Sequence, residues 1–240
     1  MKAIKFVNEL MRIERPVFTI EDAVRLINKP RPYVILYLHR LEKQELIKRI
    51  ERGKYALKDA NPFVIASNLV FPSYISLWMA FHIHHLTTQL PIIIEVVTSK
   101  QKLPLELDDY RIEFIKMKPK LIFGYRKTKS ALGYMYLAEK EKALIDRLYL
   151  NRGPDLDDIR HALHECDLKK LEEYALQMNS KALIMRLGYL LEKEGLAAPE
   201  SFKEAAYSKT ILLTPSASRE GEKNKKWHII ANYQFDTYGH

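Results

Sequence analysis

Seven basic and aromatic side chains between residues 31 and 54 have the types and spacing suited to binding a polyanion. They are Arg31, Tyr33, Tyr37, Arg40, Arg49, Arg52 and Lys54. Arginine can donate two hydrogen bonds to a guanine edge, and lysine neutralises phosphate charge. Tyrosine can contact a phosphate or the methyl group of thymine. The chemistry expected of this segment is recognition of double-stranded DNA.

The apolar pattern around these side chains predicts a helix that begins near Arg31. Val34, Leu38 and Leu41 recur at i, i+4 and i+7 and should pack inward. The outward side then holds Arg31, Tyr33, Leu36, Tyr37 and Arg40. Burial of apolar surface does not explain that set, so this face is free to meet a partner.

Two earlier helices and a later hairpin complete the segment. Ile4, Val7, Leu10 and Met11 form the apolar stripe of a first helix that ends before Pro16. Thr19 and Asp22 have capping-box spacing, and a second helix should run from there to a stop before Pro30.

After Leu46 the period becomes alternating in IKRIERGKYAL, and Arg52-Gly53 marks a hairpin turn. Three short helices followed by a basic hairpin are typical of a winged helix-turn-helix. Such folds place the third helix in the major groove, which is about 12 Å wide. The basic hairpin, or wing, can then reach phosphates.

The net charge is unevenly distributed along the chain. Of 39 Lys and Arg and 30 Asp and Glu, residues 1–58 hold 14 and 7, a charge of +7, and the remainder carries only +2. This distribution favours a polyanion-binding module joined to a body with another task. Two alternatives stay open: a merely solvated basic surface, and a winged helix that docks protein through Tyr33, Leu36 and Tyr37.

Composition indicates a folded chain in a reducing compartment. Hydrophobic residues make up 47% of the 240 residues, and Cys166 is the single cysteine. No apolar run approaches the ~20 residues of a membrane span, and charges interrupt the N-terminus as they would not in a signal peptide. We therefore expect a cytoplasmic protein without a membrane partner.

Asn61 and Pro62 mark the expected boundary between a winged-helix domain, residues 1–60, and an α/β domain, residues 61–240. The second domain should hold a helix over 74–86 and strands over 92–98, 111–117, 121–125 and 134–137. Helices should follow over 139–150, 155–166, 168–178 and 180–194, and short strands over 210–214 and 227–233. The predicted class is α+β: a winged helix-turn-helix, then a mixed α/β domain with a small sheet and a helical tail.

Three clusters could hold a metal ion. They are His82, His84 and His85; His161, His164 and Cys166; and Asp108, Asp109 and Glu113 beside Lys116. In each the spacing is wrong for convergence: His84 points away from its neighbours, the second cluster lacks a fourth ligand, and Glu113 and Lys116 face opposite sides of a strand. Phosphate-loop and hydrolase motifs are missing. We expect no metal, no cofactor and no enzymatic activity, with a metal-dependent DNA-processing enzyme as the lesser alternative.

The segments RIERGKYAL, SYISLWMAFHIHHLTTQLP, IIIEVVT, KPKLIFGYRK and LAEKEKALIDRLYL together resemble the AbiEi family of antitoxins, over about residues 18–165. The family often has a His-Gly pair where this chain has His84-His85, so no role is carried over to either histidine. The resemblance implies a repressor of its own operon in a type IV toxin-antitoxin system. It also implies that the second domain counters a nucleotidyltransferase-like toxin without a stable complex. The operator, the oligomeric state and the way the toxin is countered do not follow from the sequence.

Overall fold

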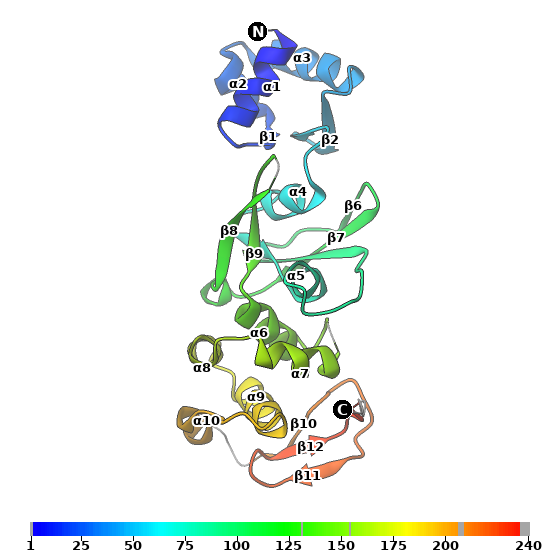
Figure 1. The fold of residues 1–240 in the computed structure, drawn as a ribbon. Helices are drawn as coiled ribbons and strands as arrows, with labels where there is room; N and C mark the ends of the chain where they lie inside the picture. Colours follow the sequence, from blue (N-terminus) through cyan, green and yellow to red (C-terminus); the bar gives the residue numbers. More distant parts are fainter. Residues whose placement is uncertain (1, 131, 154, 206–208, 236–240) are drawn as a thin grey trace. The chain divides into compact units, whose positions relative to one another are not determined.

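The computed structural model describes residues 2–130, 132–153, 155–205 and 209–235. The chain divides into two compact units (Figure 1). The first contains Met1–Ile75, Ile92–Ile122 and Arg126–Leu137, and the second contains Ser76–Pro91, Phe123–Tyr125 and Ala138–His240. The α+β class predicted from the sequence is confirmed.

The first unit begins with a winged helix-turn-helix, as predicted. Its elements are α1 (Ala3–Arg12), β1 (Val17–Thr19), α2 (Ile20–Ile27), α3 (Arg31–Lys43), β2 (Ile47–Glu51) and β3 (Lys54–Leu57). The three strands form an antiparallel sheet in the order β1-β3-β2. Thr19 caps α2 in a reciprocal capping box with Asp22, which confirms the predicted start of that helix.

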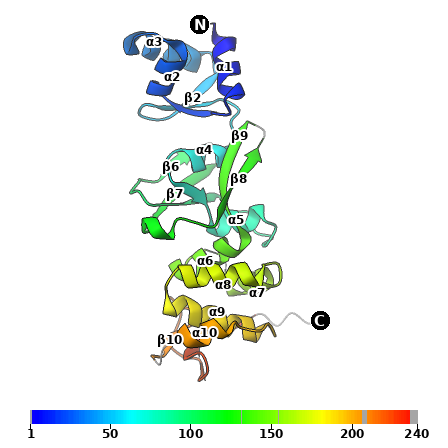
Figure 2. The same ribbon diagram turned by 90° about the vertical axis from the view of Figure 1, so that its left-hand side faces the viewer.

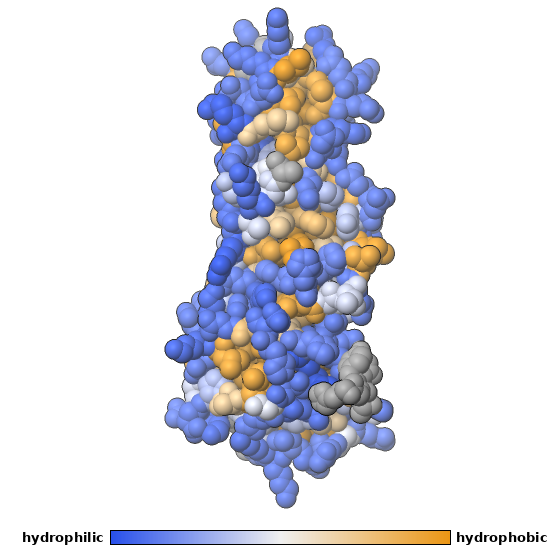
Figure 3. Space-filling view, viewed as in Figure 1, coloured by the Kyte–Doolittle hydropathy of each residue, from blue (hydrophilic) through white to orange (hydrophobic). Residues whose placement is uncertain are grey.

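The inner face of α1 differs from the predicted stripe. Phe6 and Leu10 are buried, whereas Ile4 is 73% and Met11 43% exposed. The Phe6 ring packs edge-on against Phe18, with centroids 5.6 Å apart, so the aromatic residue determines which side of α1 faces the core. Figure 3 shows hydrophobic surface among the polar residues of the first helices.

A six-stranded mixed sheet makes up most of the rest of the first unit, and only Tyr125 of β8 and Ala138 of β9 are assigned to the second unit. Its elements are α4 (Pro62–Asn68), β4 (Ser73–Ile75), β5 (Ile93–Thr98), β6 (Leu105–Leu107), β7 (Tyr110–Lys116), the 3-10 helix η1 (Pro119–Leu121), β8 (Tyr125–Ser130) and β9 (Gly133–Ala138). The strand order is β6-β7-β5-β4-β9-β8, with β5 and β7 parallel and β4 antiparallel to β5. Strand β8 therefore lies at one edge.

The strands predicted over 92–98, 111–117 and 134–137 are confirmed as β5, β7 and β9. Two predictions were wrong. The helix predicted from residue 74 begins only at Leu77, because Tyr74 and Ile75 pair with Val97 and Val96 in the sheet. The strand predicted over 121–125 is a 3-10 turn and a loop, since Pro119 starts the turn and Gly124 adopts φ +67°.

The second unit is a helical stack with a small sheet. Its elements are α5 (Leu77–Ile83), α6 (Lys140–Leu150), α7 (Leu156–His164), α8 (Leu168–Gln177), α9 (Lys181–Lys193), α10 (Glu200–Ala205), β10 (Ile211–Leu212), β11 (Glu222–Asn224) and β12 (Ile229–Ala231). Helix α6 contacts α7, α8 and α9, and Figure 2 shows these helices in layers. Trp227 is buried against Gly188 of α9 and donates its indole N–H to Glu192 at 2.9 Å.

Candidate nucleic-acid interface

Helix α3 has one buried side and one exposed side. Val34, Leu38 and Leu41 are buried, as their spacing predicts. The other side carries Arg31, Tyr33, Ile35, Leu36 and Arg40, all exposed. Pro32 fits in the first turn because the first N–H groups of a helix have no intrahelical acceptor.

The two arginines of α3 are available to solvent. The Arg31 Nε lies 3.4 Å from Glu21 Oε1, and both side chains are about 60% exposed, so this ion pair is weak. The exposed side chain of Arg40 makes no hydrogen bond or ion pair with any other residue in the described part of the chain. Either guanidinium can therefore turn to a partner at little cost in free energy.

The two predicted tyrosines differ in their surroundings. Their rings stack with centroids 6.5 Å apart, and Tyr33 is 47% exposed. The Tyr37 ring packs edge-on against Phe6 at 5.6 Å, and its hydroxyl is buried without a hydrogen-bond partner among the described residues. Burial, and then the neighbouring Tyr33, raise the pKa of Tyr37. Tyr37 therefore packs against the protein core, and Tyr33 is the more accessible of the two tyrosines.

The wing carries two exposed arginines. Gly53 adopts φ +79° at the turn between β2 and β3, a backbone conformation that would be strained for a residue with a side chain. Arg52 occupies the same turn, and Arg49 lies on β2 beside a register shift. Both side chains are exposed, and neither is paired within the described part of the chain.

Lys54 is held by the protein itself. Its ammonium group donates to the carbonyl of Leu69 and lies 3.0 Å from Glu51. Lys102 also donates to Glu51, and Lys48 pairs with Asp108 at 2.5 Å. Burial raises the pKa of Glu51, but the bonds from Lys102 and Lys54 outweigh it and hold that pKa below its usual value. These contacts tie the wing to the six-stranded sheet.

A hollow of about 590 Å³ brings four of the seven predicted side chains together. Arg31, Arg49, Arg52 and Lys54 line it, with Glu21 as the acidic member. Tyr33, Tyr37 and Arg40 lie on α3 outside it. The result is a basic concavity between the start of α3 and the wing. Glu21 lies on α2, and no local sequence pattern linked it to the basic residues of α3 and the wing.

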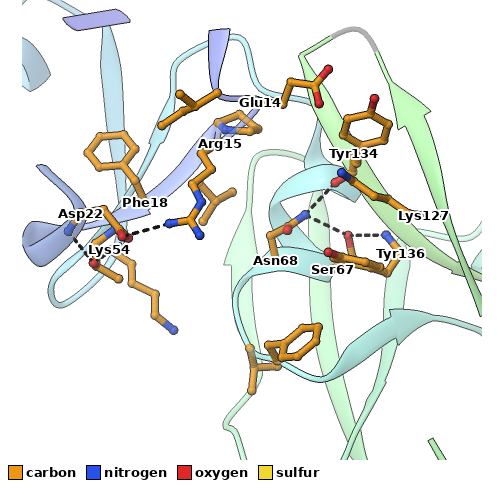
Figure 4. A pocket seen from close by; sticks show the side chains of 16 residues that line it. Glu14, Arg15, Phe18, Asp22, Lys54, Ser67, Asn68, Lys127, Tyr134 and Tyr136 are labelled. Atoms are coloured by element: carbon orange, nitrogen blue, oxygen red, sulfur yellow. Dashed lines mark hydrogen bonds and ion pairs between the residues drawn. The ribbon is translucent and has the colours of Figure 1, made fainter. Parts of the chain in front are cut away.

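A second hollow, of about 520 Å³, lies between the winged helix and the sheet (Figure 4). Arg15, Lys54 and Lys127 line it. The Arg15 Nη1 lies 3.1 Å from Asp22, and the Lys127 Nζ lies 3.7 Å from the centre of the Tyr134 ring. Sequence analysis did not single out Arg15 and Lys127, because more than a hundred residues separate them and no local pattern links them.

The histidine and cysteine clusters serve local contacts. The His84 Nε2 lies 2.7 Å from the carbonyl oxygen of Ala138, and burial lowers the pKa of His84. The His164 Nε2 lies 3.4 Å from Glu194, and burial raises the pKa of Cys166 to about 12. Within the described ranges, no three His, Cys, Asp or Glu side chains are grouped so as to hold a metal ion.

Two of the three carboxylates considered for a nuclease pair with basic side chains. Asp108 pairs with Lys48, and the Arg111 Nε lies 3.4 Å from Glu113. Asp109 is exposed beside them in the turn between β6 and β7. Among the helices that the structure describes, none is both long and apolar enough to cross a membrane.

The fold is thus that of a winged helix-turn-helix joined to a mixed sheet, with a basic concavity between helix and wing. Residues 5–58 match the family described as "Transcriptional regulator, AbiEi antitoxin". The resemblance noted from the sequence is confirmed over this segment.

A solved structure supports the fold over nearly the whole chain. The RV2827C protein from Mycobacterium tuberculosis is 15% identical in sequence, with a TM-score of 0.61 over 95% of this chain and 90% of that one. No curated protein matches the chain in sequence.

Proposed function

We propose that this protein is a cytoplasmic transcriptional repressor that binds double-stranded operator DNA through α3 and the wing. The observation that carries the proposal is the basic concavity, in which Arg31, Arg49 and Arg52 meet although they come from two separate elements. The match of residues 5–58 to a transcriptional regulator family supports it. We assign this role to residues 1–60.

The test measures the affinity of the full chain for DNA from upstream of its own operon and for random DNA of equal length. Arg31→Ala and Arg40→Ala should reduce discrimination by about 1 to 3 kcal/mol, because α3 meets base edges. Arg49→Ala and Arg52→Ala should weaken binding to both duplexes alike, because the wing meets phosphates. Arg12→Ala is the matched control, since Arg12 lies on α1 and pairs with Glu9 at 2.8 Å.

One observation favours a rival function. Leu36 is 61%, Tyr33 47% and Ile35 38% exposed on the outward face of α3, and exposed apolar side chains are common where proteins dock. In a DNA complex the same groups would contact thymine methyls. DNA binding that is weak, insensitive to salt and unaffected by Arg52→Ala would favour protein docking. Mg²⁺-dependent cleavage of the duplex would favour a DNA-processing enzyme.

We further propose that residues 61–240 act as the antitoxin of a type IV system and counter a nucleotidyltransferase-like toxin encoded beside this gene. The support is the description of the family that residues 5–58 match, together with the resemblance to that family of the sequence segments between residues 73 and 150. The full-length double variant Arg49→Ala/Arg52→Ala should lose repression of its operon but still restore colony formation in cells that express the toxin. Loss of both activities in a folded variant would contradict this division of roles.

A further inference from the structure

The first unit carries essentially all of the net positive charge. It contains 23 Lys and Arg against 13 Asp and Glu, a charge of +10, whereas the second unit contains 16 against 17, a charge of −1. Residues 1–58 account for +7 of this. The six-stranded sheet therefore adds basic charge of its own to the unit that holds the winged helix.

The added charge is concentrated in one stretch of sequence. Between Glu113 and Glu139 there are six Lys and Arg and no Asp or Glu. Arg126, Lys127 and Lys129 of this stretch lie on β8, the strand at one edge of the sheet. Lys127 and Lys129 are exposed and, two residues apart on a strand, they share one face.

Strand β9 packs against both the winged helix and α4. A Cβ at Gly133 would come within 2.7 Å of the Pro16 ring, so β9 packs directly on the start of β1. Asn68 of α4 donates to the Tyr134 carbonyl at 2.8 Å, and the Tyr136 N–H donates to Ser67 at 3.1 Å. The packing of Gly133 on Pro16 thus places β9 beside β1, and the two hydrogen bonds hold β9 on α4.

The two hollows adjoin each other between the wing and β8. The hollow beside α3 and the hollow beside β8 share Thr19 and Lys54 as lining residues. Beyond Lys54, the second hollow continues to Arg15 and Lys127 (Figure 4). The Tyr134 ring beneath the Lys127 ammonium holds that charge at the surface.

The arrangement fits a duplex backbone better than a small anion. Glu14 and Asp22 also line the second hollow, and Arg15 pairs with Asp22, so the hollow is not uniformly positive. Lys129 lies outside the hollow and extends the charge along the strand. Residues two apart on a strand are about 6.7 Å apart, roughly twice the 3.4 Å axial spacing of phosphates on one DNA strand.

We propose that Lys127 and Lys129 of β8 form a second phosphate-binding surface, which contacts the DNA backbone beside the site held by α3 and the wing. This inference rests on the proposed function and deepens it. The sheet then contributes to affinity directly, and the footprint on DNA is longer than that of a winged helix alone. Because the contact is to phosphates, it adds affinity without sequence preference.

The test compares the full chain with Lys127→Ala/Lys129→Ala in salt titrations of binding to a duplex of about 30 base pairs. If both lysines contact phosphates, the slope of log K against log[salt] should become shallower by about 1.8. Affinity at 0.15 M salt should fall by about 30-fold, equally for operator and random DNA. The matched control is Lys118→Ala/Lys120→Ala, two exposed lysines beside and within η1 that line neither hollow.

A double variant that binds like the η1 control, while Arg52→Ala still weakens binding, overturns this inference and leaves the proposed function standing. A loss seen with Lys127→Ala but not with Lys129→Ala also overturns it, because that pattern belongs to a local anion site in the hollow. If the wild-type chain fails to bind DNA at any salt concentration, the proposed function fails together with the inference. Circular dichroism and thermal melting verify that each variant is folded.

Discussion

Replacing Arg52 by alanine isolates the electrostatic contribution of the wing tip. Arg52 is exposed, is unpaired within the described part of the chain, and lines the hollow between α3 and the wing. Removing one phosphate contact should make the slope of log K against log[salt] shallower by about 0.9. If the two proteins bind equally at 1 M salt, this change in slope lowers the DNA affinity of the variant by about fivefold at 0.15 M salt and about 15-fold at 0.05 M salt.

The assay is fluorescence anisotropy with a labelled operator duplex at several salt concentrations. Arg12→Ala should leave both the affinity and the slope unchanged, because Arg12 pairs with Glu9 on α1, away from the hollow. Arg52→Ala should not alter the free energy of unfolding, since its exposed side chain forms no ion pair or hydrogen bond within the described part of the chain. An equal loss at every salt concentration would refute the reasoning, because it would mean that Arg52 acts through the shape of the wing rather than through its charge.

Lys54→Ala is the informative comparison, because Lys54 bonds to the Leu69 carbonyl and to Glu51. The Lys54→Ala variant should lower the free energy of unfolding by about 1 kcal/mol in urea titrations. A variant that loses DNA affinity but keeps its full stability would show that those bonds do not hold the wing. Burial raises the pKa of Asp22, but bonds from Thr19 and Arg25 outweigh it and lower that pKa overall. The ionised Asp22 therefore stabilises the capping box at neutral pH, and Asp22→Ala should lower the free energy of unfolding there by roughly 1 kcal/mol. This difference should shrink as the pH falls below about 4. A difference that is the same at every pH would show that the charge of Asp22 does not stabilise the helix. Gly188→Ala should destabilise the second unit by about 1 to 3 kcal/mol, because the new Cβ would lie 2.4 Å from the Trp227 ring, and an unchanged melting temperature would show that the ring can move away. Cys166, with its pKa raised to about 12 by burial, should react with iodoacetamide at pH 8 far more slowly than free cysteine, and rapid labelling would show that the site opens.

Local sequence signals were sufficient for the winged helix. The spacing of Val34, Leu38 and Leu41 identified the buried side of α3, Thr19 and Asp22 identified the start of α2, and Gly53 identified the wing turn. Each of these features depends on residues close together in the chain, where helix periodicity, capping and positive φ act directly. The exposed arginines followed from the same periodicity, since positions off the buried stripe of a helix face outward.

The features that sequence reasoning missed depend on residues distant in the chain. Tyr74 and Ile75 read as helical, but hydrogen bonding to β5 makes them strand. The Phe6 ring, by packing on Phe18 and Tyr37, turned Ile4 outward and the Tyr37 hydroxyl inward.

The same holds for the basic surface as a whole. The amino-acid sequence by itself determined the winged helix and its excess of positive charge. Only the tertiary structure decided that Lys54 is bound to Leu69 and Glu51 and that Lys127 of β8 lies across a hollow from it. The physical reason is that pairing between distant strands and packing between distant side chains depend on how the whole unit folds. Local periodicity reflects only residues that are close together in the chain, so it cannot predict these contacts.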